Sequence, residues 1–493
     1  MKFQSTRDKS AAKFTAAEVI KQGLASDGGL FVPESIPTLT AEEIQALCAV
    51  DYPTRAAKIL GKFLTDYTEE ELLADCRAAY AETSFVGGAA PVVALDGTLH
   101  SLELWHGPTA AFKDMALQIM PRLLSRALTK TGEKRTALIL VATSGDTGKA
   151  ALEGYKDIDG IKIAVFYPEN GVSRVQKLQM QTQLGNNVYV CAIDGNFDDA
   201  QTGVKRIFSD DKAASYLNEK GYFFSSANSI NWGRLAPQIV YYVSAYCDLL
   251  TKGTLKMGEK MNVTVPTGNF GNILAAYIAK LMGLPIDRLI CASNKNNILT
   301  DFFNTGVYDR NRAFHLTMSP SMDILISSNL ERLLYFMAGT ERTAAYMDSL
   351  NKTGAYKVED EVKAAIDESF CGFFADEQET AKTIREVMDQ YGYLADTHTA
   401  VALSAAKQYV EKTGDKKPMI VASTASPYKF AIDVYRSLYH AEPTDALSAL
   451  DELSAKTGTS IPYPLCGIGE RIVRFTDVVP SADMWKAVQK YLG

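Results

Sequence analysis

The pattern of apolar and polar residues changes near residue 95, and this change limits which folds the chain can adopt. Beyond it, short apolar runs rich in β-branched residues alternate with stretches of helical periodicity. Strands of this kind, separated by helices, build mostly parallel sheets in α/β folds. We expect strands at 136–142, 161–166, 188–193, 263–265, 288–292 and 419–422. We expect helices at 114–130, 146–157, 198–209, 234–250 and 272–282.

The segments on either side of this region look helical. Amphipathic helices are expected near 41–62 and 68–82, and a helical tail after residue 430. The strands suffice for two sheets, so we predict an α/β protein with two lobes of mostly parallel sheets flanked by helices. We divide the chain into an N-terminal helix-rich domain (1–95), a two-lobed α/β region (96–430) and a C-terminal helical tail (431–493).

Composition narrows the function classes. A net charge of −7 argues against general nucleic-acid binding. The aliphatic runs are too short to span a bilayer, and the first residues have no apolar signal core. The seven cysteines form no CxxC pair, which disfavours a zinc site and favours a reducing compartment. We therefore expect a cytoplasmic protein that uses no metal and binds neither membrane nor nucleic acid.

A lysine stands where the first polar turn of the α/β region meets a predicted helix. Residues 106–114 are His-Gly-Pro-Thr-Ala-Ala-Phe-Lys-Asp, so Lys113 has small and apolar neighbours. Burial there would lower the pKa of the amine, as a Schiff-base lysine needs. An exposed lysine in the first turn of a helix is the simpler explanation, and on this motif alone it is favoured.

A glycine-rich turn, Pro-Thr-Gly-Asn-Phe-Gly-Asn at 266–272, lies between a predicted strand and a predicted helix. This arrangement can hold a phosphate on free backbone N–H groups at the positive end of the helix. The spacing is not the Gly-x-Gly-x-x-Gly of dinucleotide sites. A plain tight turn is equally consistent with the motif.

Two further turns follow predicted strands. The turn at 141–151 contains Gly148-Lys149, but Thr143 and Ala150 stand where a P-loop needs glycine and Ser/Thr. Its hydroxyls could bind a carboxylate or a phosphate, although a helix cap is favoured. In the turn at 422–430, a hydroxyl could be a neutral partner for a ring nitrogen, and a strand-to-turn cap is again the simpler explanation.

A polar stretch at 225–234 precedes another predicted helix. It could form a surface for a polar substrate or an ordinary helix entry. His398 opens an alanine-rich helix and is interpreted as a capping histidine rather than a catalytic base.

Taken in order, these motifs resemble those of the threonine synthases, fold-type II pyridoxal-phosphate enzymes of the tryptophan synthase β-like superfamily. The resemblance runs from about residue 23 to 430. The matching motifs are GLASDGGLFVP, HGPTAAFKDMALQ, TSGDTGKAAL, GNFDDAQ, SSANSINWGR, PTGNFGNILAAY, DTHTAVAL and, less closely, STASPYKF.

The resemblance implies pyridoxal 5'-phosphate as cofactor. Lys113 resembles the lysine that carries it, and Asp146 lies in the loop that meets its ring hydroxyl. Thr424 resembles the hydroxyl that binds the pyridine nitrogen. A neutral hydroxyl does not hold that nitrogen protonated, which limits how much charge the ring absorbs. The cofactor-phosphate loop would comprise Gly268, Asn269, Phe270, Gly271 and Asn272.

The resemblance also implies residues for the substrate. The loop with Thr143, Ser144 and Thr147 would meet the substrate carboxylate. The residues implied for the substrate phosphate are Ser226, Asn228, Asn231 and Arg234, with Ser173, Arg174 and Lys177 as weaker candidates. One departure is Ser426, where the family often has a histidine, which puts a neighbouring contact in doubt rather than the cofactor.

The activity implied is the conversion of O-phospho-L-homoserine and water to L-threonine and phosphate, by a monomer or a homodimer. The closest alternative is a related phospho-lyase that yields 2-oxobutyrate, ammonia and phosphate. A threonine or serine dehydratase would usually have a glycine-tetrad phosphate loop in place of GNFGN. A non-catalytic binding module on the same fold is disfavoured by the intact Lys113, phosphate loop and Thr424.

Overall fold

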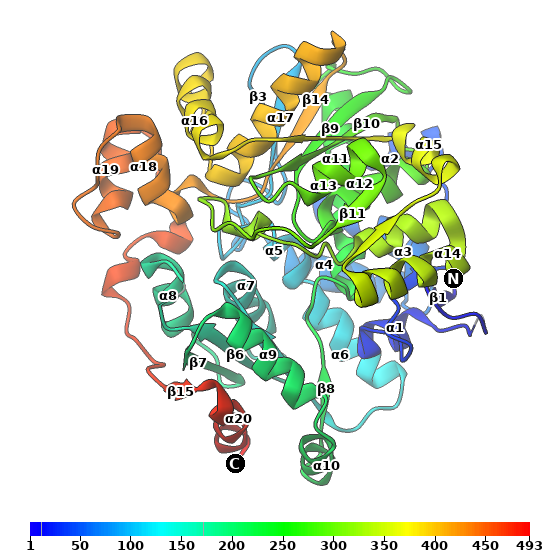
Figure 1. The fold of residues 1–493 in the computed structure, drawn as a ribbon, viewed down its shortest axis with the longest axis vertical. Helices are drawn as coiled ribbons and strands as arrows, with labels where there is room; N and C mark the ends of the chain where they lie inside the picture. Colours follow the sequence, from blue (N-terminus) through cyan, green and yellow to red (C-terminus); the bar gives the residue numbers. More distant parts are fainter. Residues whose placement is uncertain (11, 171) are drawn as a thin grey trace.

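Two mostly parallel sheets organise the chain, as the alternation of strands and helices predicts (Figure 1). The structure is a computed structural model that describes residues 1–10, 12–170 and 172–493. One sheet has six strands in the order β13-β10-β9-β14-β4-β3, and the other has five in the order β15-β7-β6-β5-β8. The predicted two-lobed α/β architecture is confirmed.

The six-stranded sheet is parallel except for the β3–β4 pair. Its strands are β3 (Val92–Ala94), β4 (Leu99–Glu103), β9 (Met261–Pro266), β10 (Ile286–Ser293), β13 (Phe370–Phe374) and β14 (Met419–Ser423). Helices of this lobe are α11 (Trp232–Thr251), α12 (Gly271–Leu281), α13 (Ile298–Thr305), α16 (Glu377–Tyr391) and α17 (Thr397–Thr413). Since β4, β14 and β9 are parallel neighbours, their carboxyl ends meet at one edge.

The five-stranded sheet is parallel throughout. Its strands are β5 (Thr136–Ala142), β6 (Ile161–Pro168), β7 (Val188–Asp194), β8 (Tyr222–Ser225) and β15 (Val478–Pro480). Its helices are α7 (Asp146–Tyr155), α8 (Arg174–Gln181), α9 (Phe197–Phe208), α10 (Asp211–Glu219) and α20 (Met484–Leu492). The C-terminal tail therefore returns to this sheet, and β15 lies beside β7 in the lower part of Figure 1.

The N-terminal region pairs two short strands, β1 (Phe3–Ser5) and β2 (Phe31–Pro33), and adds four helices. The helices are α1 (Ala16–Gln22), α2 (Ala41–Cys48), α3 (Tyr52–Phe63) and α4 (Glu69–Ala79). The single helix expected at 41–62 is two helices. Asp51 caps α3 by accepting from Thr54 N, and the proline that follows Tyr52 can begin a helix but not continue one.

The helix expected at 114–130 is also divided, into α5 (Asp114–Leu117) and α6 (Met120–Lys130), and Pro121 again stands at the start of the second helix. The remaining elements are β11 (Val307–Asp309), β12 (Ala355–Lys357), α14 (Leu330–Thr353), α15 (Asp360–Asp367), α18 (Ala431–Tyr439) and α19 (Ser448–Thr457). Short 3-10 turns lie at Pro320–Met322, Pro427–Phe430, Tyr463–Leu465, Ile468–Glu470 and Ser481–Asp483.

Helix α11 is buried on nearly every face and joins the N-terminal region to the six-stranded lobe. The Trp232 ring lies edge-on to Phe3 and Phe63, with ring centroids 5.3 and 5.6 Å away. Arg55 of α3 forms a 2.7 Å ion pair with Asp248 at the other end of the helix. Among the described helices, none combines the length and apolarity needed to cross a bilayer.

Candidate active site

Three of the motifs meet at the carboxyl edge of the six-stranded sheet. Lys113 lies in the turn after β4, Thr424 in the turn after β14, and the glycine-rich loop follows β9. Phe112 N donates to Thr424 O at 2.8 Å, and Ala111 pairs with Ala425. The lysine and the buried Thr424 therefore share one backbone framework, although 311 positions (424 − 113) separate them in the chain.

The other two motifs follow β5 and β8, which are neighbours in the five-stranded sheet. Side-chain contacts join the two edges. Lys113 Nζ lies 3.8 Å from Asp146 Oδ2, and Lys429 Nζ lies 2.7 Å from Asp146 Oδ1. The site thus lies where the carboxyl edges of both sheets meet, the usual ligand position in α/β proteins.

Lys113 is buried, at 9% exposure. Burial lowers the pKa of its amine from 10.5 to about 8. The Asp146 carboxylate opposes this shift, and the Lys429 and Arg234 cations add to it. The lowered pKa makes the neutral amine more accessible near physiological pH than it is for an exposed lysine, as a nucleophilic lysine requires.

Asp146 is held in an ion pair with a second buried lysine. The Lys429 side chain is 0% exposed, and its Nζ also donates to Thr109 O at 2.9 Å. Gln176 Nε2 donates to the same carboxylate at 2.9 Å. Burial alone would raise the pKa of Asp146, but the Lys429 and Lys113 cations hold it well below its ordinary value.

Asp114 holds the turn that carries the lysine. Its carboxylate accepts from Thr109 N at 2.8 Å and from Thr109 Oγ1 at 2.7 Å. Burial raises the pKa of Asp114 to about 6 despite these bonds. A Cβ on Gly107 would lie 2.6 Å from Asp114, so the turn closes tightly only around glycine. The carboxylate therefore fixes the backbone next to Lys113.

The glycine-rich loop leads into α12 through Phe270, whose φ of 64° is unusual for a bulky residue. Its ring packs against Phe303 and Phe370, each with ring centroids 6.0 Å apart, which holds this backbone shape. Within the described part of the chain, no side chain caps the N-terminus of α12. Asn272 Nδ2 is buried without a hydrogen-bond partner among the described residues, and its Oδ1 accepts from Tyr242.

Gly268 lies in the same loop, where a Cβ would come 2.6 Å from Ser321 O. An uncapped helix end, a glycine cradle and an unpaired buried amide are the features that a bound phosphate would complete. The loop therefore fits a bound phosphate group close to Lys113.

Arg234 is a buried cation near the lysine. Its Nη1 donates to Ala227 O at 2.9 Å, and its Nε has no hydrogen-bond partner within the described part of the chain. Burial lowers the pKa of its guanidinium to about 10, opposed by Tyr155. A desolvated guanidinium with unused donors is suited to a bound anion.

The other residues of the 226–231 turn serve the fold. Asn231 caps α11 and donates to Ile20 O and Ser226 O at 3.0 and 3.2 Å. Ser226 Oγ accepts from Asn228 N at 3.2 Å, and Asn228 is exposed. Of the four residues expected at the substrate phosphate, Arg234 is the one with a buried unpaired donor.

In the 143–147 loop, too, one expected substrate-binding residue stabilises the fold and the others are at least partly exposed. Thr143 Oγ1 accepts from Gly145 N and Gly148 N, both at 2.9 Å, so this hydroxyl stabilises the loop itself. Ser144 is exposed and Thr147 is half-buried. The weaker candidates lie at α8, where Ser173 caps the helix, Arg174 is exposed and Lys177 pairs with Glu169.

Ser426, the departure from the family pattern, caps the 3-10 turn Pro427–Phe430 by accepting from Tyr428 N. Sequence reasoning gave no role to Lys429, Gln176 or Ser321. Lys429 could have been found, because it is a lysine in an apolar strand-end turn, as Lys113 is. Gln176 and Ser321 carry no local signal.

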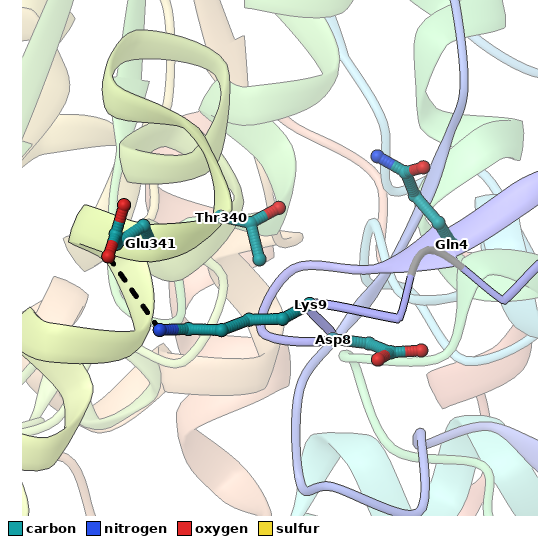
Figure 2. A pocket seen from close by; sticks show the side chains of 5 residues that line it. All are labelled: Gln4, Asp8, Lys9, Thr340 and Glu341. Atoms are coloured by element: carbon teal, nitrogen blue, oxygen red, sulfur yellow. Dashed lines mark ion pairs between the residues drawn. The ribbon is translucent and has the colours of Figure 1, made fainter.

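A shallow hollow lies elsewhere, between the N-terminal segment and α14 (Figure 2). Its Lys9 and Glu341 side chains are 71% and 87% exposed and 3.7 Å apart, and such pairs contribute little. It is lined by Gln4, Asp8, Lys9, Thr340 and Glu341. Among the described residues, no cluster of three or more His, Cys, Asp or Glu side chains could bind a metal ion.

Three models of known protein families match successive parts of the chain. The family model described as pyridoxal-phosphate dependent enzyme matches residues 86–424. The models for the threonine synthase N terminus and the threonine synthase C-terminal region match residues 2–80 and 399–490. The fold and the site thus define a fold-type II pyridoxal-phosphate-dependent enzyme.

Within that class, the chain belongs to the threonine synthase family. It is 40% identical to the threonine synthase of Pseudomonas aeruginosa, over 87% of this chain and 89% of that protein. The crystal structure of pyridoxal-phosphate-bound threonine synthase from Brucella melitensis is 37% identical, with a TM-score of 0.88 over 100% of this chain and 98% of that one. Human threonine synthase-like 1 is 41% identical over 88% of this chain, which spans 59% of that longer relative.

Proposed function

We propose that this protein is a threonine synthase, which converts O-phospho-L-homoserine and water to L-threonine and phosphate. The observation that carries the proposal is the pair of buried cations at the junction of the sheets. Lys113 offers an amine with a lowered pKa, and Arg234 offers a guanidinium nearby whose Nε has no hydrogen-bond partner among the described residues. An enzyme that acts on a phosphorylated amino acid needs a reactive amine to carry the cofactor and a site that binds the phosphate.

The residues around Lys113 fit pyridoxal 5'-phosphate. Lys113 would carry the cofactor, the 268–272 loop would hold its phosphate, and Thr424 would meet its pyridine nitrogen. When bound, the cofactor supplies an electron sink for carbanion chemistry. Asp146 would face the polar side of the ring, with Lys429 keeping that carboxylate ionised.

The proton transfers fall to Lys113. Once the substrate amine has displaced it, the free amine can take the proton from Cα, pass it to the substrate phosphate, and then take a proton from Cβ, after which phosphate leaves from Cγ. Lys113 can then return the Cβ proton to Cγ. Water adds its hydroxyl at Cβ, and Lys113 passes the proton released from water to Cα, which completes L-threonine. Its pKa of about 8 suits an amine that must both accept and give protons near neutral pH.

The substrate phosphate is assigned to Arg234, with Ser226, Asn228 and Asn231 forming the surrounding turn. We predict that Arg234→Met raises KM for O-phospho-L-homoserine about tenfold or more, because a charge-assisted contact is lost. Arg234→Lys keeps the charge and should lose less. Equal KM values for the wild type and Arg234→Met would remove this residue from the site.

Product analysis tests the activity. With O-phospho-L-homoserine, the holoenzyme should release L-threonine and phosphate in equal amounts, measured by chromatography and a phosphate assay. Release of 2-oxobutyrate and ammonia with phosphate would overturn the proposal in favour of the phospho-lyase. The same assay on Lys113→Ala should show neither set of products.

We also propose that the protein acts in the cytoplasm, as a monomer or homodimer, on small molecules and not on nucleic acid. The net charge of −7 supports this, as do the described cysteines, all of which are free thiols. Sedimentation analysis of the holoenzyme would give the oligomeric state.

A further inference from the structure

A short turn outside the sequence motifs touches two parts of the site. This turn, Pro320–Met322, lies between β11 and α14. Lys113 Nζ donates to Ser321 Oγ at 3.3 Å. The carbonyl oxygen of the same serine is the atom that a Cβ on Gly268 would approach to 2.6 Å. Ser321 therefore lies against both the lysine amine and the phosphate loop.

The position of Ser321 is set by a buried histidine. Ser321 N donates to His398 Nε2 at 3.1 Å, and His398 Nδ1 lies 2.9 Å from Asp396 Oδ1. His398 and Asp396 are 2% and 0% exposed. Since Nε2 accepts, Nδ1 must carry the proton and donate it to the carboxylate, which fixes the tautomer. His398 has no free nitrogen for acid–base work and serves to hold Ser321.

Asp396 is itself tied to the cofactor edge of the sheet. It caps α17 by accepting from His398 N and Thr399 N. The Thr399 hydroxyl contacts Asp396 and also lies 3.1 Å from Ser423 Oγ, at the end of β14. Ser423 immediately precedes Thr424. The chain of contacts thus begins beside the proposed pyridine-nitrogen residue and ends at Lys113.

Further contacts hold the turn and the histidine in place. Asn294, which follows β10, donates from Nδ2 to Ser319 O at 3.3 Å and Ser319 Oγ at 3.0 Å. The His398 ring packs on Phe430, with ring centroids 4.8 Å apart. Groups locked in this way by packing and hydrogen bonds can keep a reactive side chain within a narrow range of positions.

We propose that Ser321, held by the His398–Asp396 pair, is a positioning residue that retains the Lys113 amine beside the phosphate loop whenever that amine is free. An amine that donates one N–H to a hydroxyl keeps its lone pair available to accept a proton. The inference rests on the proposed role of Lys113 and extends it, because it assigns the group that steadies the base between proton transfers.

The test compares Ser321→Ala and His398→Leu with variants that keep the needed groups, Ser321→Thr and His398→Gln. Each apoprotein is titrated with pyridoxal 5'-phosphate to give Kd, and kcat and KM are measured on the holoenzyme. Losing the contact should raise Kd about fivefold to tenfold and lower kcat about tenfold with KM unchanged. Ser321→Thr and His398→Gln should recover most of both quantities.

The matched control is His100→Gln. His100 is another buried histidine, 4% exposed, in β4 of the six-stranded sheet, with its Nδ1 3.1 Å from Thr98 O. It should leave Kd and kcat unchanged. Wild-type Kd and kcat in Ser321→Ala would overturn the inference, as would equal losses in Ser321→Ala and Ser321→Thr. The Kd of pyridoxal 5'-phosphate is measured without substrate, so it can be interpreted even if the proposed activity is wrong.

Discussion

Replacing Lys429 by methionine should both destabilise the protein and shift the pKa of Lys113. Charges 2.7 Å apart attract by roughly 6 kcal/mol at an effective dielectric constant of about 20. Breaking a buried pair by removing one partner typically costs about 3–5 kcal/mol, because the other charge stays buried. We expect a loss of this size in the free energy of unfolding of Lys429→Met.

The same change removes a cation that lowers the pKa of Lys113 and frees Asp146 to interact with it. The midpoint of Lys113 should therefore rise from about 8, by about one pH unit. The charged groups that act on the amine are Asp146, Lys429, Arg234 and Asp114. Removing the Lys429 cation makes the net charge around the amine more negative, which favours its protonated form.

Two assays measure these effects on the apoprotein. Urea unfolding gives the stability, and the pH dependence of the rate of pyridoxal 5'-phosphate capture gives the midpoint of the amine. The double variant Lys429→Met/Asp146→Asn removes both charges and should recover much of the lost stability. If Lys429→Met has the unfolding free energy and the capture profile of the wild type, Lys429 neither stabilises Asp146 nor lowers the pKa of Lys113.

Two further predictions concern stability. A buried lysine with a folded pKa of about 8 and an unfolded pKa of 10.5 destabilises the fold below pH 8, and the penalty disappears as pH rises from 8 to 10.5. Lys113→Met should therefore raise the unfolding free energy of the apoprotein at pH 7 by at most about 3 kcal/mol, with no gain above pH 10.5; a gain that persists at high pH would contradict this. Gly154→Ala should cost about 1–3 kcal/mol in urea unfolding, because its Cβ would overlap Leu117 O at the end of α5. Gly61→Ala in α3, where the nearest atom is 3.6 Å away, is the matched control and should be neutral or stabilising.

The fold could be predicted where strands are apolar and buried on both faces. The strand expected at 136–142 is β5, and the strand expected at 419–422 is β14 less its last residue. The short β4, Leu99–Glu103, contains a histidine, a serine and a glutamate. It is not predicted from the sequence because these polar residues interrupt the apolar run that marks a buried strand. The order of strands within each sheet depends on contacts between distant segments, which no local pattern carries.

The site could be predicted as a set of turns but not as a network. Strand ends and glycine spacing mark the turns that carry Lys113 and Thr424. The pairing of Asp146 with Lys429 joins residues 283 positions apart (429 − 146), so it becomes visible only when both sheets are in place. Ser321 lies in a turn with no distinctive composition, and its role follows entirely from what folds against it.

Lys113 is the residue that we propose carries the cofactor, and chemical labelling locates that residue. Borohydride reduction of the holoenzyme fixes the cofactor on its lysine, and peptide mapping by mass spectrometry then locates it. The structure offers three buried lysines near the site, Lys113, Lys149 and Lys429. We predict the modification on Lys113. A modification on Lys149 or Lys429, or none on any of the three, would show that Lys113 does not carry the cofactor.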